Sequence, residues 1–177
     1  MQQNLIFITS KIKIMKMEHQ KQTQSAASGF MMYKKLLLMV LLSFVAMYVL
    51  MYSMVNTFSN AIPNINQFYM AGLMTMPMVI LELAIMGAMY MKKKLNAIIF
   101  TVSFIILIGF FLCIRYQTAV SDKQFLKGMI PHHAAAILMA GKANIKDPEV
   151  KKLTEQIISS QQADIEQMKA KLKEMKK

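Results

Sequence analysis

Three long apolar runs constrain the fold of this chain more than any other feature of its sequence. They occupy residues 36–55, 69–91 and 95–114, and they account for most of the 55 % apolar content of the 177 residues. A run of about twenty apolar residues is long enough to cross the hydrocarbon core of a bilayer as a helix. The sequence therefore predicts an all-α protein with three transmembrane helices.

The lysines that flank these runs predict the orientation of the helices. The formal net charge is +12, and lysines stand at positions 34–35 and 92–94, whereas the connection 56–68 carries no charge. By the positive-inside rule, the lysine-rich ends face the cytoplasm. We therefore expect a multi-pass protein of the plasma (inner) membrane, with a cytoplasmic N-terminus and an extracytoplasmic C-terminal segment.

This reading divides the chain into three parts. Residues 1–33, with a polar Gln- and Ser-rich second half, are expected to form a disordered cytoplasmic tail. Residues 34–115 form the transmembrane region, and residues 116–177 form a helical module. No basic stripe is interleaved with aromatic residues, so the expected partner is the lipid bilayer and not nucleic acid.

Glu82 lies near the middle of the second apolar run, where an ionised carboxylate is costly. Met74 and Met78 precede it at helical spacing and share its face. Two interpretations are open. Glu82 is protonated and hydrogen-bonded to a neighbouring helix, with methionine as flexible filler, or this face forms a membrane site for a soft cation.

After Arg115 the sequence predicts two helices, at about residues 122–140 and 148–175. Ser121 and Gln124 have the spacing of a capping box at the start of the first helix. Asp147 followed by Pro148 is an N-cap and a first-turn proline for the second helix. The connection is short, so the two helices are expected to form an antiparallel hairpin.

The first of these helices carries two adjacent histidines, His132 and His133, between Met129 and Met139. Imidazole and thioether groups together suit soft or borderline metal ions such as Cu(I). Adjacent helical positions diverge by about 100°, so both histidines cannot easily bind one ion from one chain. Whether they serve different ions or different subunits, or are simply surface and core histidines, stays open at this point.

The pattern D-x-x-F-x-x-x-M-I-P-H-H at 122–133, followed by Q-x-x-D-I-x-x-M at 161–168, is similar to the domain-of-unknown-function family 305. That is a ferritin-like helical family associated with extracytoplasmic binding of copper and other heavy metals. The resemblance covers about residues 121–175. It implies half of a ferritin-like four-helix bundle, so a homo-oligomer formed through the hairpin is expected. Asp164 stands where the family often has Glu. The ligand candidates that the resemblance implies are Met129, His132, His133 and Met139, with Met168 a weaker one.

The leading hypothesis is therefore a non-enzymatic, membrane-anchored binding protein for copper, as Cu(I), for Ag(I) or for another heavy metal, which acts in metal tolerance or handover. A transporter-accessory subunit that uses the Glu82 and methionine face is one alternative. A ferritin-like redox enzyme is another, but the sequence contains no E-x-x-H, so the usual carboxylate-bridged di-iron pattern is absent.

Overall fold

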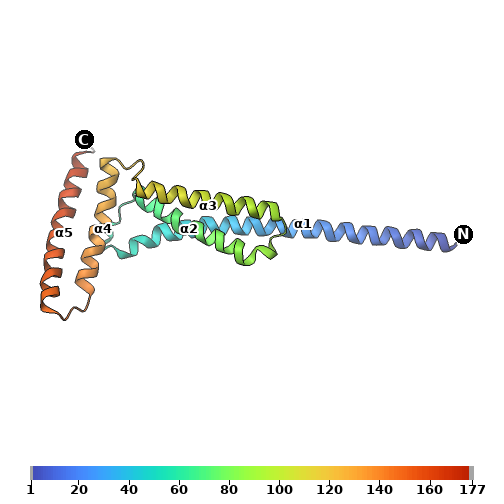
Figure 1. Cartoon of the computed structure of the whole chain (residues 1–177), viewed down its shortest axis with the longest axis horizontal. Coiled ribbons are helices and arrows are strands. Elements are labelled where there is room, and N and C mark those ends of the chain that lie inside the picture. Colours follow the sequence, from blue (N-terminus) through green and yellow to red (C-terminus); the bar gives the residue numbers. More distant parts are fainter. Residues whose placement is uncertain (1, 176–177) are drawn as a thin grey trace.

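The computed structural model describes the backbone of residues 2–175 and the side chains of residues 15–17 and 29–175. Within that part of the chain there are no strands. Figure 1 shows α1, α2 and α3 side by side, with α4 and α5 as a hairpin that stands across one end of them. The all-α class is confirmed, with the five helices α1 (Gln2–Leu50), α2 (Ile65–Met86), α3 (Lys93–Arg115), α4 (Asp122–Lys142) and α5 (Pro148–Glu174).

Three segments of the described chain are long and apolar enough to cross a membrane: Gly29–Met54, Ile65–Met89 and Lys93–Arg115. We call them the apolar bundle. In the most apolar stretch of the middle segment 39 % of the residues are buried, against 6 % in each of the other two. The middle helix therefore lies between its neighbours, whose outer surfaces are apolar and exposed. This arrangement indicates that the protein associates with a membrane.

Small residues allow α2 and α3 to pack closely. Ala71 and Thr75 are fully buried, and the Thr75 hydroxyl donates to the Ala71 carbonyl at 2.7 Å, so no polar hydrogen is left unpaired. Gly72 contacts the ring of Phe110, and a Cβ atom at position 72 would overlap that ring. Close approach of backbones at small residues is how helices associate where the surroundings are as apolar as the side chains.

The structure differs from the disordered tail predicted for residues 1–33, because α1 continues to Gln2. Its N-terminal part extends beyond the other helices (Figure 1). The physical reason lies in the composition of this stretch. Residues 2–28 contain neither glycine nor proline and are rich in Gln and Lys. Once the apolar part of α1 is helical, each further residue extends an existing helix at little cost, whereas starting a new helix is unfavourable.

The hairpin core contains four buried side chains, from Ile130 and Ala134 of α4 and Ile165 and Leu172 of α5. Partly buried apolar residues complete this core. Some of them come from the connection between α1 and α2, and the set is Val55, Ile62, Leu126, Ile137 and Met168. The hairpin is therefore packed onto the end of the apolar bundle.

The predicted capping box at the start of α4 is wrong. Ser121 occupies the N-cap position, but its side chain makes no capping hydrogen bond. The Gln124 Oε1 atom instead accepts a hydrogen bond from the backbone N–H of Ile65, at 3.2 Å. The first N–H groups of α2 lack helical partners, and Gln124 satisfies one of them from the neighbouring helix. The Tyr69 hydroxyl also donates to the Thr118 carbonyl at 3.0 Å, so α2 is tied to the connection before α4.

The start of α5 follows the prediction. Asp147 is the N-cap, and its Oδ1 atom accepts hydrogen bonds from the backbone N–H groups of Glu149 and Val150, at 2.9 and 3.0 Å. Pro148 is the first residue of the helix, where its missing N–H has no consequence. The two long helices of the hairpin therefore begin and end within two residues of the predicted positions.

Candidate metal centre

His132 and His133, adjacent on α4, face different parts of the molecule. The side chain of His133 is 14 % exposed and lies against Asp164 of α5. His132 is exposed and lines a cavity between the hairpin and the apolar bundle. The divergence of about 100° between adjacent helical positions thus separates the predicted ligands into two groups.

Both ring nitrogens of His133 have close partners. Nδ1 lies 3.0 Å from the carbonyl oxygen of Met129, and a carbonyl can only accept, so Nδ1 carries a hydrogen. Nε2 lies 3.4 Å from Oδ2 of Asp164. In the neutral tautomer, Nε2 has a lone pair and faces a second acceptor. A cation between the two atoms, either a proton or a metal ion, satisfies both.

The sequence did not lead to Asp164 as a candidate ligand, although it contained a usable signal. Asp164 lies seven residues after Ile157 and four before Met168, so it belongs to the apolar face of α5. An acidic residue on an apolar helix face needs a partner across the interface. The identity of that partner depends on the register of the two helices, which the sequence does not specify.

The His133–Asp164 pair defines that register. Because α4 and α5 are antiparallel, the residue four positions before His133 lies opposite the residue four positions after Asp164. These residues are Met129 and Met168, both partly buried. We call Met129, His133, Asp164 and Met168 the hairpin site. It combines one imidazole and one carboxylate with two thioethers that lie one helical turn away.

The other two predicted ligands, His132 and Met139, line the junction cavity, which has a volume of about 350 Å³. This cavity lies where α4 meets the apolar bundle. Three further methionines from the bundle line it, together with amide side chains and small residues of α4. The full lining comprises Met51, Met54, Asn64, Asn66, Gln67, Met70, Gly128, Pro131, His132, Ala135 and Met139.

The donor atoms available limit which metals these residues can hold. Among the residues that the structure describes, no three His, Cys, Asp or Glu side chains come together. A metal site in either place would therefore need other donors as well, and thioether sulfur is the one that both places offer. Thioethers bind soft ions such as Cu(I) and do not favour hard ions such as Mg²⁺ or Ca²⁺. The residues present fit a soft metal ion.

Glu82, Met74 and Met78, the predicted membrane site, are arranged differently from the hairpin residues. Glu82 Oε1 accepts a hydrogen bond from the Tyr90 hydroxyl at 3.1 Å. This partner follows the same helix in the chain and is not on a neighbouring helix. Met74 is 42 % exposed on the outer surface of the bundle, and Met78 is partly buried. The hydrogen bond gives the Glu82 carboxyl group a polar partner without any cation.

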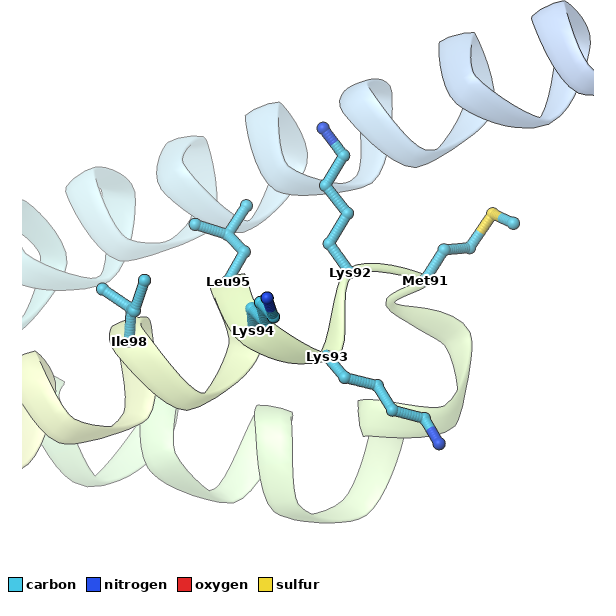
Figure 2. Close-up of a pocket in the computed structure, with 6 residues that line it drawn as sticks. All are labelled: Met91, Lys92, Lys93, Lys94, Leu95 and Ile98. Carbon is cyan, nitrogen blue, oxygen red and sulfur yellow. The ribbon is translucent and has the colours of Figure 1, made fainter.

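A larger depression, of about 660 Å³, surrounds the turn between α2 and α3. Figure 2 shows the three lysines of this turn pointing in different directions, with Lys92 toward α1 and Lys93 away from it. Side chains that diverge in this way do not form a shared anion site. They instead place positive charge at the end of the apolar bundle that lies away from the hairpin (Figure 1).

Comparison with known proteins gives two matches. The family model described as "Domain of unknown function (DUF305)" matches residues 113–172, which include almost the whole hairpin. The "Uncharacterized protein L153" of Acanthamoeba polyphaga mimivirus is 40 % identical over 147 residues, which are 80 % of this chain and 93 % of the viral protein. No solved structure matches.

The similarity to the viral protein is not confined to the matched domain. The alignment of 147 residues is more than twice as long as the family match at residues 113–172, so it extends into the apolar bundle. The viral protein is therefore similar to this chain in part of the apolar bundle as well as in the hairpin. The chain therefore belongs to the DUF305 family, and the hairpin with its His133–Asp164 pair is its family domain.

Proposed function

We propose that this protein is a membrane-anchored binding protein for a soft heavy-metal ion, with copper as Cu(I) or Ag(I) as the first candidates. It would act in metal tolerance or handover. The observation that supports this most is the orientation of His133, whose Nδ1 donates to the Met129 carbonyl while Nε2 faces Asp164. Metal-binding histidines almost always donate their other ring N–H to a carbonyl or carboxylate, which orients the ring and fixes its tautomer.

The separation of the two facing atoms suits a bound metal ion. At the 2.0–2.1 Å typical of zinc, two ligands of a tetrahedral ion lie about 3.3–3.4 Å apart, and Nε2 of His133 and Oδ2 of Asp164 have a similar separation of 3.4 Å. Asp164 is half-exposed, at 49 %, so an ion can reach the pair from solvent. Met129 and Met168 supply the thioethers that distinguish copper and silver from harder cations.

We further propose that the hairpin is extracytoplasmic and the N-terminus cytoplasmic. The lysines at 34–35 and 92–94 support this orientation. The turn at 92–94 and the hairpin lie at opposite ends of the apolar bundle (Figure 1). An epitope at the C-terminus should be digested when intact cells are treated with protease. A protected epitope would contradict the orientation.

The alternative functions have less support. A transporter-accessory role would use Glu82, but its carboxyl group is already hydrogen-bonded to Tyr90. A redox enzyme of the ferritin-like type would need a carboxylate-bridged metal pair, and the sequence has no E-x-x-H. We therefore propose binding without turnover. Bound iron together with oxygen consumption by the purified protein would favour the enzyme instead.

The hairpin site is tested with the full-length protein in lipid nanodiscs, titrated with Cu(I) against a competing chelator. The His133→Ala/Asp164→Asn variant should lose the ion bound at this site, because it removes the imidazole and the carboxylate charge. Glu155→Gln is the matched control, since Glu155 is an exposed acid on α5 outside the site. It should bind as the parent does. A folded double variant that keeps the metal content and affinity of the parent would exclude the hairpin site.

A further inference from the structure

The junction cavity contains more thioethers than the hairpin site. We propose that it is a second metal site, selective for a monovalent soft cation, which the hairpin and the apolar bundle form together. Its ligands are His132, Met139, Met51, Met54 and Met70. This inference rests on the proposed function, which supplies the class of ion. It extends metal binding to methionines that lie outside the matched family domain at 113–172.

On α4, the residues that line the cavity form one continuous face. Gly128, His132, Ala135 and Met139 follow one another at intervals of four, three and four residues, which is the spacing of a single helix face. Two of the four are small and leave room beside the imidazole and the thioether. A Cβ atom at Gly128 would lie 3.6 Å from Oδ1 of Asn64, so α4 approaches the start of α2 closely here.

The bundle presents its three methionines from two elements. Met51 and Met54 begin and end the short 3-10 helix η1 (Met51–Met54), where residues three apart lie on the same side. Met70 lies one turn after Asn66 on α2, and both line the cavity. Met54 is 48 % exposed and Met70 38 % exposed, so neither side chain is fixed by surrounding atoms. Methionine is unbranched and flexible, and such side chains can turn toward an ion.

The charge of the lining argues for a monovalent ion. None of the eleven residues that line the cavity is Asp, Glu, Lys, Arg or Cys, and His132 is the one among them that can be protonated. Sites for divalent ions usually include carboxylate or thiolate ligands, which offset the charge of the ion. Neutral thioether and imidazole donors favour Cu(I) or Ag(I) instead. The junction cavity is therefore expected to be more selective than the hairpin site, which contains Asp164.

Asn66, one of the residues that line the cavity, has an unpaired side-chain oxygen atom. The Asn66 side chain donates from Nδ2 to Oε1 of Gln117 at 3.0 Å. Its Oδ1 atom is buried and has no hydrogen-bond partner among the described residues. Buried acceptors normally have a partner. The polar groups beside the cavity are therefore not all paired within the described part of the chain.

The test uses the full-length protein in lipid nanodiscs and Ag(I) as the probe. The parent should bind two ions per chain. The Met51→Leu/Met54→Leu/Met70→Leu variant should lose one of them, because leucine keeps the apolar volume and removes the sulfur. Met31→Leu/Met86→Leu/Met89→Leu is the matched control, since these methionines are exposed on the same two apolar segments and do not line the cavity. It should still bind two ions.

A second measurement uses the unmodified parent and does not depend on the folding of a variant. Bound Ag(I) should protect Met51, Met54, Met70 and Met139 from oxidation by peroxide, as read by peptide mass spectrometry. The exposed Met89, which does not line the cavity, should be oxidised equally with and without the ion.

The outcomes separate this inference from the proposed function. If the cavity variant binds two ions with parental affinity, or if the control variant loses the same ion, the junction site is overturned. Unprotected cavity methionines in the silver-loaded parent also overturn it. If His133→Ala/Asp164→Asn retains both ions while the cavity variant loses one, the hairpin site fails and the junction site stands.

Discussion

In the apolar bundle, α2 packs so closely on α3 that Gly72 has no room for a methyl group beside Phe110. In the hairpin, by contrast, the core has four buried side chains and is completed by Val55 and Ile62 of the bundle connection. A two-helix unit of this size buries little apolar surface by itself. The difference indicates that the bundle is a closely packed platform, and that the hairpin depends on it both for stability and for the second half of the junction cavity.

The largest expected effect comes from removing a side chain at the centre of the hairpin core. Ile165 is 1 % exposed, so Ile165→Ala should destabilise the hairpin by about 2–5 kcal/mol. Hydrogen exchange followed by mass spectrometry should show α4 and α5 exchanging faster, with α2 and α3 unchanged. Phe125→Ala, at a position of α4 that is 51 % exposed and outside the hairpin core, is the control and should change little. Equal acceleration in all four helices would show that the hairpin and the bundle unfold as one unit.

A smaller effect is expected in the bundle. Gly72→Ala places a methyl group against the Phe110 ring, which also contacts the rings of Phe68 and Tyr69 and so has little freedom to move. Overpacking of this kind should cost about 1–3 kcal/mol, measured by thermal unfolding in detergent. Gly87→Ala is the control because a Cβ atom there meets nothing within 4 Å.

The double variant Gly72→Ala/Phe110→Leu tests the cause of that loss. It should recover part of the stability, because the smaller side chain makes room for the methyl group. No recovery would mean that the close contact at Gly72 is not what limits the packing of α2 on α3.

The smallest effect concerns the apolar residues that the hairpin leaves uncovered at its tip. Val150 and Leu153 are 44 % and 53 % exposed, and we propose that a second copy of the chain covers them to complete a four-helix bundle. Leu153→Glu should weaken this self-association about tenfold, or by about 1.4 kcal/mol. Sedimentation of the full-length protein in detergent measures it. A parent that is monomeric at all concentrations would rule out the dimer.

The local features of this protein could be predicted from its sequence. The three apolar helices, the hairpin and the Asp147 cap depend on hydropathy and on residues a few positions apart, and the structure contains all of them. The prediction failed where another interaction outweighed the local sequence pattern. The tail continues as helix from α1, and Gln124 bonds to Ile65, 59 residues away, in place of its own helix.

The candidate sites show the same contrast between what the local sequence predicts and what tertiary packing decides. The sequence by itself determined that imidazoles and thioethers are concentrated on α4, because residue identity sets the donor atoms. Only the tertiary structure decided which partner each histidine faces. His133 meets Asp164 because of the register of α5. His132 lines one cavity with Met51, Met54 and Met70 because α4 lies across the end of the bundle. Register and docking depend on packing between residues far apart in the chain, and no local spacing encodes them.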